Sequence, residues 1–206
     1  MTNLRPTDIS LPGVLVGADL VGSSDFQAQT GSRVSLALEA YCYDWADASE
    51  EHRQHPVIHR AAPFEPQDKL LLTGVVLPLS RPCELGGWVL DLAGIPIHVT
   101  NAQDRSGSSV LAAPDENNPR SQSHYASPVP GTWVRIEGTV SIADDYVVDE
   151  VEQSLQRPVE RPWLVQRIVR LVPLPGRGKR EFRAQPAQSI HHTRDASSYL
   201  VDLAAA

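Results

Sequence analysis

The sequence predicts a mainly β protein, and three stretches lead to this prediction. In Gly131–Ile142, small and apolar side chains alternate with polar and aromatic ones, which is the period of a half-buried strand. Gly31–Trp45 alternates in the same way from Arg33 on. In Gly86–Asn101, two alternating runs flank Ala93-Gly94, a tight-turn signal, so this stretch predicts two antiparallel strands.

The composition is that of a chain that can bury a core without disulfides or metals. It has 206 residues, 41% of them hydrophobic, which suits one decorated domain or two small ones. The first ten residues have neither the basic start nor the apolar run of a signal peptide, and no apolar run approaches the roughly 20 residues of a membrane helix. We therefore expect a cytoplasmic protein that does not contact a membrane.

The first 60 residues predict a β/α extension. Residues 1–12 indicate an irregular arm, and Gly13–Gly22 indicates a short strand before the longer strand that starts near Gly31. Ala46–Arg60 is charged, and Asp47 or Ser49 can cap a helix there that Pro56 ends.

The remaining chain predicts further strands and one long loop. Residues 102–130 lack any long periodic stretch, and loops of this length in compact domains are usually functional or partly disordered. The other expected elements are a strand over Lys69–Ser80, a hairpin turn at Asp144-Asp145, a returning strand over Tyr146–Glu150, a last strand over Arg161–Pro175, and a partly flexible tail whose final segment "SYLVDLAAA" forms a short helix or frays.

Three glycine-containing motifs follow one another in the middle of the chain: "LLLTGVV" (Leu70–Val76), "DLAG" (Asp91–Gly94) and "GTWVRIEGTV" (Gly131–Val140). In this order they resemble the first strand, the second hairpin turn and the fourth strand of the OB-fold superfamily, in particular its single-strand and tRNA-anticodon binding branches. The resemblance covers Lys69–Pro175 and implies a five-stranded, OB-like Greek-key barrel that includes Arg161–Pro175 as its final strand. Residues 1–60 then form an extension packed on the barrel, residues 61–175 the barrel, and residues 176–206 a basic linker and C-terminal tail.

Charge is distributed unevenly along this acidic chain, whose formal net charge is −7. Residues 1–150 hold 9 Lys+Arg and 20 Asp+Glu, a net of −11, and residues 151–206 hold 9 and 5, a net of +4. The acidic part repels a phosphate backbone, whereas the basic end can offset this repulsion locally.

The resemblance implies that a nucleic acid binds on the outer face of the second and third strands, over aromatic side chains in a positive groove. The outward positions of those strands are Val89, Asp91, Pro96, His98 and Thr100. Trp88 has the opposite parity and is expected in the core. One histidine and one acid make a poor stacking surface, which argues against direct nucleic-acid binding there.

A second candidate is a group of tryptophans and basic residues on the outer surface. Trp133 and Arg135 are two positions apart and both face outward in the alternating pattern. Trp163 begins the last strand, near Arg161. Such residues can stack on bases and neutralise phosphates, or the tryptophans can instead cover the N-terminal extension. The candidate nucleic-acid-binding residues are Trp133, Arg135, Arg161, Trp163, Arg167, Arg170, Arg177, Lys179 and Arg180.

The remaining reactive residues indicate neither catalysis nor metal binding. His52, His55 and His59 are close in sequence, but Pro56 breaks their spacing, which favours a solvated helix end. The two cysteines, at positions 42 and 83, lack zinc spacing, and the chain has no common hydrolase, phosphate-loop or dinucleotide motif. We expect no enzymatic activity, no cofactor and no metal.

Two functions from different classes follow. The first is a non-catalytic OB-fold accessory protein that binds single-stranded nucleic acid or a nucleoprotein complex, assisted by the basic C-terminal segment. The alternative is a protein-interaction or assembly module that uses its acidic surface and makes no direct nucleic-acid contact, since fold alone does not fix function.

Overall fold

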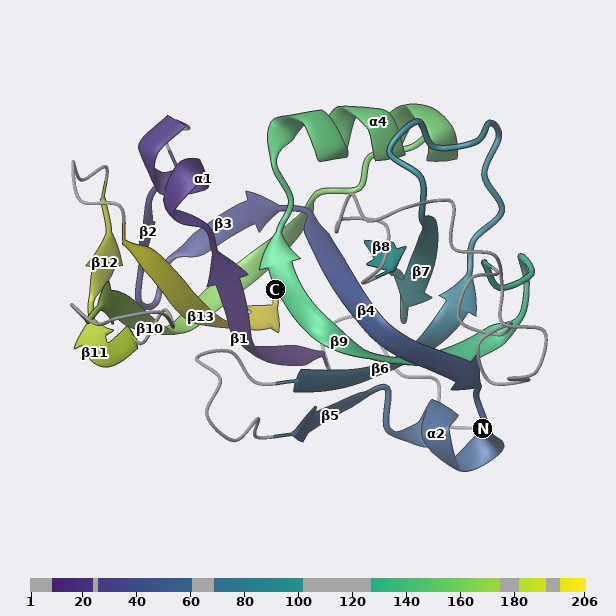
Figure 1. The fold of residues 1–206 in the computed structure, drawn as a ribbon, viewed down its shortest axis with the longest axis horizontal. Helices are drawn as coiled ribbons and strands as arrows, with labels where there is room; N and C mark the ends of the chain where they lie inside the picture. Colours follow the sequence, from purple (N-terminus) through teal and green to yellow (C-terminus); the bar gives the residue numbers. More distant parts are fainter. Residues whose placement is uncertain (1–8, 24–25, 61–68, 102–126, 175–181, 192–196) are drawn as a thin grey trace.

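The structure is a computed structural model, and it describes residues 9–23, 26–60, 69–101, 127–174, 182–191 and 197–206. The protein is mainly β, as the sequence predicts, with a closed five-stranded barrel. A second group of strands lies beside the barrel, and both groups belong to one continuous 11-stranded sheet (Figure 1).

The barrel has an OB-like arrangement of five strands. They are β4 (Leu38–Asp47), β6 (Lys69–Val76), β7 (Trp88–Leu92), β8 (Ile95–Asn101) and β9 (Trp133–Ile142). β6, β7 and β8 form consecutive antiparallel pairs. β4 then pairs in parallel with β8 and antiparallel with β9, and β9 returns to pair with β6, which closes the barrel.

The strand that closes this barrel is not the expected one. The sequence analysis assigns Arg161–Pro175 as the final barrel strand, and this assignment is wrong because β10 (Arg161–Pro173) pairs with strands outside the barrel. β4, which precedes the other four strands in the chain, fills the place between β8 and β9. Relative to the expected order, the closing strand has moved from the end of the barrel sequence to its beginning, as in a circular permutation.

The second group of strands joins the two ends of the described chain. β13 (Ser198–Ala205) lies between β1 (Ser10–Val16) and β10, antiparallel to both. The other edge of β10 pairs with β3 (Arg33–Leu36) and β11 (Phe182–Ala187). β2 (Ala28–Gln29) and β12 (Ser189–Ile190) form a separate two-stranded sheet. Ala37 alone separates β3 from β4, so one stretch of chain runs from this group into the barrel.

Three expectations about local structure are wrong. Residues 10–12, expected in an irregular arm, belong to β1, and the segment ending "SYLVDLAAA" forms β13 rather than a helix. The expected turn at Asp144-Asp145 and strand over Tyr146–Glu150 are instead the start of helix α4 (Asp145–Leu155). A helix starts here because the Asp144 carboxylate accepts a hydrogen bond from the Val147 amide at 2.9 Å and so caps the first turn.

The other two described helices are short. α1 (Ala18–Ser23) follows β1, and α2 (Glu50–Gln54) follows β4. α2 begins as predicted, with Ser49 as N-cap, and it ends at His55, just before Pro56. β5 (Val57–Arg60) then pairs with β6. Among the described residues, no helix is long and apolar enough to cross a membrane.

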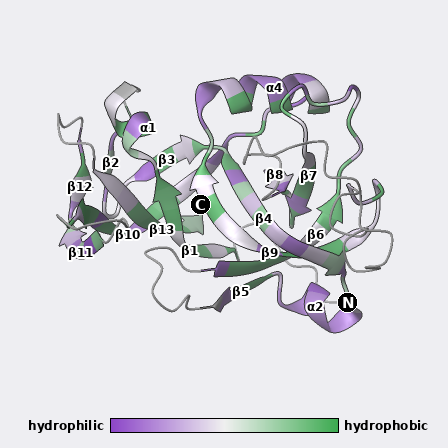
Figure 2. Ribbon diagram, viewed as in Figure 1, coloured by the Kyte–Doolittle hydropathy of each residue, from purple (hydrophilic) through white to green (hydrophobic). Residues whose placement is uncertain are grey.

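The core runs without interruption from the barrel into the second group of strands. β9 shows the predicted alternation, with Val134, Ile136, Val140 and Ile142 buried. The same cluster includes Trp163 of β10 and residues of β1 and β13. Figure 2 shows hydrophobic residues along β1 and β6 and a mixture of both kinds on α4, as expected for a helix with one buried side.

Two glycines of the OB-like motifs allow neighbouring strands to approach closely. A Cβ atom on Gly74 would lie against the backbone carbonyl of Asp91 in β7, and one on Gly138 would lie against the carbonyl of Tyr41 in β4. Both positions are therefore restricted to glycine by the curvature of the barrel.

Candidate interaction surfaces

The outer face of β7 and β8 is covered by the protein itself. The alternation of β7 and β8 correctly predicts that Val89 and His98 point away from the barrel core. Both side chains are nevertheless buried, at 0% and 3% exposure. They lie under α4, whose Val147 and Val151 form a second apolar cluster with Val89. The face expected to meet a ligand is therefore an internal interface.

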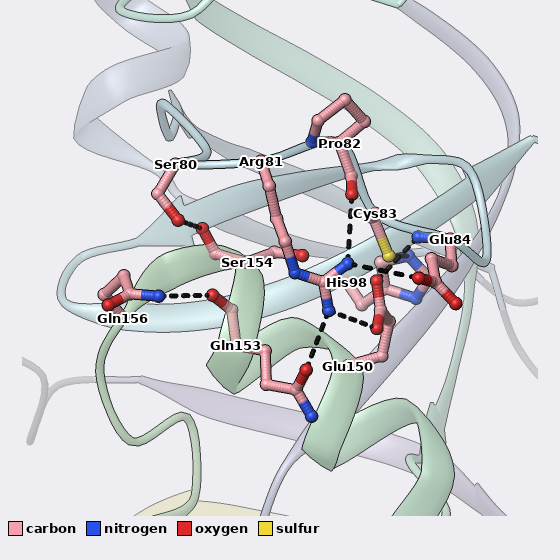
Figure 3. A network of polar contacts seen from close by, with 10 residues as sticks. All are labelled: Ser80, Arg81, Pro82, Cys83, Glu84, His98, Glu150, Gln153, Ser154 and Gln156. Atoms are coloured by element: carbon pink, nitrogen blue, oxygen red, sulfur yellow. Dashed lines mark hydrogen bonds and ion pairs between the residues drawn. The ribbon is translucent and has the colours of Figure 1, made fainter.

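A network of polar contacts fixes α4 to the loop of residues 77–87, which connects β6 and β7 (Figure 3). Arg81 donates to Glu150 Oε2 at 2.6 Å and to Gln153 Oε1 at 3.0 Å. The other carboxylate oxygen of Glu150 accepts the amide of Glu84 at 2.6 Å. Ser80 donates its amide and its hydroxyl to the carbonyl of Ser154, both at 2.8 Å. We call this set the latch.

Electrostatics in the latch favour the ionised carboxylate. The hydrogen bond from Arg81, followed by that from the Glu84 amide, holds the pKa of Glu150 below its ordinary value of 4.5. In turn, the hydrogen bond to Glu150 raises the pKa of Arg81. The two charges therefore support each other at neutral pH.

Cys83 and His98 lie together beneath the latch. The thiol Sγ is 3.8 Å from Nε2 of His98, which also lies 3.1 Å from the carbonyl oxygen of Gly86. Burial raises the pKa of the Cys83 thiol, whereas a nucleophilic cysteine needs a lowered pKa. The raised pKa disfavours the thiolate form of Cys83 at neutral pH.

The predicted group of tryptophans and basic residues is not assembled. Trp163 is fully buried at 0% exposure in the core, so the expectation that it offers a stacking surface is wrong. Trp133 is 37% exposed, as the alternation of its strand predicts. It lies on the barrel, on the same face of β9 as partly exposed Arg135. The reason for the separation is that β10 belongs to the second group of strands and β9 to the barrel.

The arginines of β10 have partners within the protein. Arg167 forms an ion pair with Asp202 of β13 at 2.7 Å, and Arg170 donates to the Ser197 hydroxyl at 3.1 Å. Arg161 donates to the backbone carbonyls of Pro158 and Glu160. Three further predicted residues, Arg177, Lys179 and Arg180, lie outside the described residues.

A different surface carries exposed aromatic residues, and we call it the outer wall. It consists of the outward-facing side chains of α2, β4, β5, β6 and β9, on the side of the barrel away from α4 (Figure 1). Its large hydrophobic side chains are Tyr43, Ile58 and Trp133, which are 42%, 37% and 37% exposed. Tyr41 packs edge-on against Tyr43, with ring centroids 5.5 Å apart.

Cations lie over two of these rings. The guanidinium of Arg53 in α2 is 5.1 Å from the centre of the Trp133 ring, and the ammonium of Lys69 is 4.7 Å from the centre of the Tyr43 ring. Sequence reasoning identified Trp133 but missed the tyrosines. The signal was available, because the alternation that buries Cys42 places Tyr41 and Tyr43 on the opposite face.

The charged residues of α2, β4, β5, β6 and β9 give this side of the barrel a small negative balance. The acids are Glu39, Asp44, Asp47, Glu50, Glu51 and Glu137, and the bases are Arg53, Arg60, Lys69 and Arg135. Six negative and four positive charges leave a net of −2. Asp44 and Glu137 are direct neighbours in the register of β4 and β9.

One of the histidines near α2 caps the start of that helix. His52 Nδ1 accepts the amide of Ser49, which completes the capping box at the helix start. Within the described ranges, no group of three or more His, Cys, Asp or Glu side chains is placed to hold a metal ion.

Comparisons of the chain with protein-family models, with curated proteins and with solved structures give no match.

Proposed function

We propose that this protein is a non-catalytic interaction module of the OB-fold superfamily, with a permuted strand order, that binds a protein partner through its outer wall. The observation that carries the proposal is the contrast between two sides of one barrel. The β7–β8 face, where OB barrels usually bind ligands, is buried under α4. The outer wall presents Tyr43, Ile58 and Trp133 to solvent.

Exposed aromatic residues of this kind are typical of protein interfaces. Tryptophan, tyrosine and arginine dominate the binding energy of such interfaces, and apolar groups gathered on one surface commonly mark a contact site. The outer wall holds one exposed tryptophan and one exposed tyrosine, with polar and charged residues around them. Aromatic side chains set among polar and charged residues in this way support a protein partner.

The Cys83–His98 pair supports the non-catalytic part of the proposal. A cysteine beside a histidine has the residue types of a nucleophile with its base, and the raised thiol pKa opposes that chemistry.

Site-specific photo-crosslinking in cells of the source organism tests the proposed surface. A benzophenone amino acid replaces Tyr43 on the outer wall or, as the matched control, Tyr146 on α4, which is 63% exposed. We expect a discrete crosslinked protein from position 43 and none of the same mass from position 146. Equal products from both positions, or none from position 43, would show that the outer wall is not the binding surface.

Single-stranded nucleic acid is the second candidate ligand, and one observation favours it. Trp133 with Arg53 above its ring, and Arg135 nearby in β9, combines a stacking surface with positive charge. Fluorescence polarisation with labelled single-stranded DNA and RNA over a salt series tests this candidate. Binding that weakens with salt and with Arg135→Glu would support it, and absence of binding at low salt would remove it.

A further inference from the structure

We propose that the outer wall binds a basic, arginine-bearing segment of its protein partner in extended conformation. This inference rests on the proposed function and adds the chemistry of the partner. Its basis is that the exposed rings of the wall stand among six acidic and four basic residues of the wall's five elements, a net charge of −2. A positively charged partner is attracted to such a surface and a negatively charged one is repelled.

The rings of the wall already bind cations from their own chain. Arg53 lies over Trp133, and Lys69 lies over Tyr43. These contacts demonstrate that each ring accepts a positive group on its face. An arginine of a partner can use the same attraction, either on the remaining exposed part of the ring or in place of the resident cation.

Carboxylates stand beside both rings, which makes each a suitable site for a guanidinium. Glu50 precedes Arg53 by three residues and therefore lies on the same side of α2 as the arginine that covers Trp133. Asp44 follows Tyr43 directly, and Glu137 is its neighbour in register on β9. Arginine is the residue that combines stacking on an aromatic ring with a bidentate contact to a carboxylate.

The spacing of the two sites defines the spacing of the arginines. Trp133 and Glu137 are four residues apart on β9 and point to the same face, so they are about 13 Å apart along the strand. An extended peptide has the same rise per residue. Two arginines separated by three residues therefore match the two sites.

A titration followed by NMR tests the proposal with the full chain. The probe is a seven-residue peptide of glycine and serine that carries two arginines with three residues between them. Two control peptides carry the arginines at adjacent positions or carry glutamines instead. We expect the probe to shift the indole N–H resonance of exposed Trp133 but not that of buried Trp163. The adjacent-arginine peptide binds more weakly, and the glutamine peptide does not bind.

Charge variants distinguish the basic peptide from a nucleic acid, because the same substitution changes the affinity for the two ligands in opposite directions. Glu50→Gln with Glu137→Gln should weaken peptide binding by about fivefold, whereas Asp145→Asn with Asp149→Asn on α4 changes it less than about twofold. Arg53→Ala should strengthen peptide binding, because it removes both a positive charge and a competitor for the Trp133 ring. The same variant should weaken binding of a single-stranded nucleic acid.

Several outcomes would overturn the inference: no shift at Trp133, equal binding of the glutamine peptide, or weaker peptide binding by Arg53→Ala. Concentration-dependent self-association in sedimentation, abolished by Tyr43→Ala, would also overturn it, because the occupant of the wall would then be a second copy of the chain. A protein crosslinked at position 43 together with no peptide binding would leave the proposed function standing and remove only the basic segment.

Discussion

Arg81 and Glu150 are 69 residues apart in the chain, and their side chains meet at 2.6 Å between the loop of residues 77–87 and α4. The Glu150 side chain is only 7% exposed, and its second oxygen accepts the Glu84 amide. One carboxylate thus joins the loop to the helix above the β7–β8 face. Removing it would take the acceptor from the Glu84 amide and would leave the Arg81 guanidinium with Gln153 as its remaining partner on α4.

The latch predicts a loss of stability in acid. Because Arg81 lowers the pKa of Glu150 in the folded protein, this carboxylate contributes stability above its ordinary pKa of 4.5 and loses that contribution as the pH falls through its folded pKa. Glu150→Gln should lower Tm at neutral pH, and the difference from the parent should shrink below about pH 4. Thermal unfolding from about pH 7 to pH 3 measures this. Asp149→Asn, exposed on the same helix, is the control, and a Tm difference that is constant with pH would contradict the assignment.

The reactivity of the two cysteine thiols reports whether the latch holds the loop of residues 77–87 in place. Burial raises the pKa of Cys42 to about 12 and also raises that of Cys83. Both thiols should therefore react slowly with Ellman's reagent in the folded protein. Glu150→Gln should accelerate labelling of Cys83, which lies in the loop, and leave Cys42 in β4 unchanged, as measured by mass spectrometry of the labelled peptides. Equal acceleration of both thiols would indicate global unfolding rather than release of the loop.

The two close strand approaches predict which glycines tolerate alanine. Gly74→Ala and Gly138→Ala each place a Cβ against a backbone carbonyl, so each should destabilise the protein by about 1–3 kcal/mol. Gly22→Ala is the control, because no atom lies within 4 Å of its added Cβ and alanine is preferred over glycine in a helix. Urea denaturation gives all three values. A neutral Gly138→Ala would mean that β4 and β9 do not pair as described.

The different exposure of Trp163 and Trp133 predicts a large loss of stability on removal of the first and a small loss on removal of the second. Trp163→Ala empties a fully buried site and should cost about 3–5 kcal/mol. Trp133→Ala removes a partly exposed ring with one cation contact and should cost about 1 kcal/mol or less. Unfolding free energies of both variants test the assignment of Trp163 to the core, which a similar cost for the two substitutions would contradict.

Local patterns in the sequence predicted individual strands well. The alternation of β9 gave the correct buried face, and the turn at Ala93-Gly94 gave the correct hairpin. The same reasoning failed at α4, although Val147 and Val151 have helical spacing and Asp144 is a good N-cap. Two adjacent aspartates were interpreted as a turn because turns and helix caps favour the same residue.

Long-range arrangement was the part that local patterns could not predict. β4 and β10 both have strand periodicity, and only β4 pairs with β8 and β9. Which of the two strands closes the barrel depends on packing between segments far apart in the chain, and the local sequence of neither strand indicates it. For the same reason the outer face of β7 and β8 was expected to be open, since nothing in Val89 or His98 indicates that α4 returns to cover them.

The position of β13 has a consequence for synthesis of the protein. Gly13 of β1 donates its amide to Asp202 of β13, a partner 189 residues later in the chain, and β13 separates β1 from β10. On the ribosome, the first strand therefore emerges long before its neighbour exists. The barrel strands β4 to β9 can pair while translation continues, but β1 and β10 present unpaired edges until residue 205 has left the exit tunnel. We therefore expect these two strand edges to need chaperone protection until β13 has been synthesised.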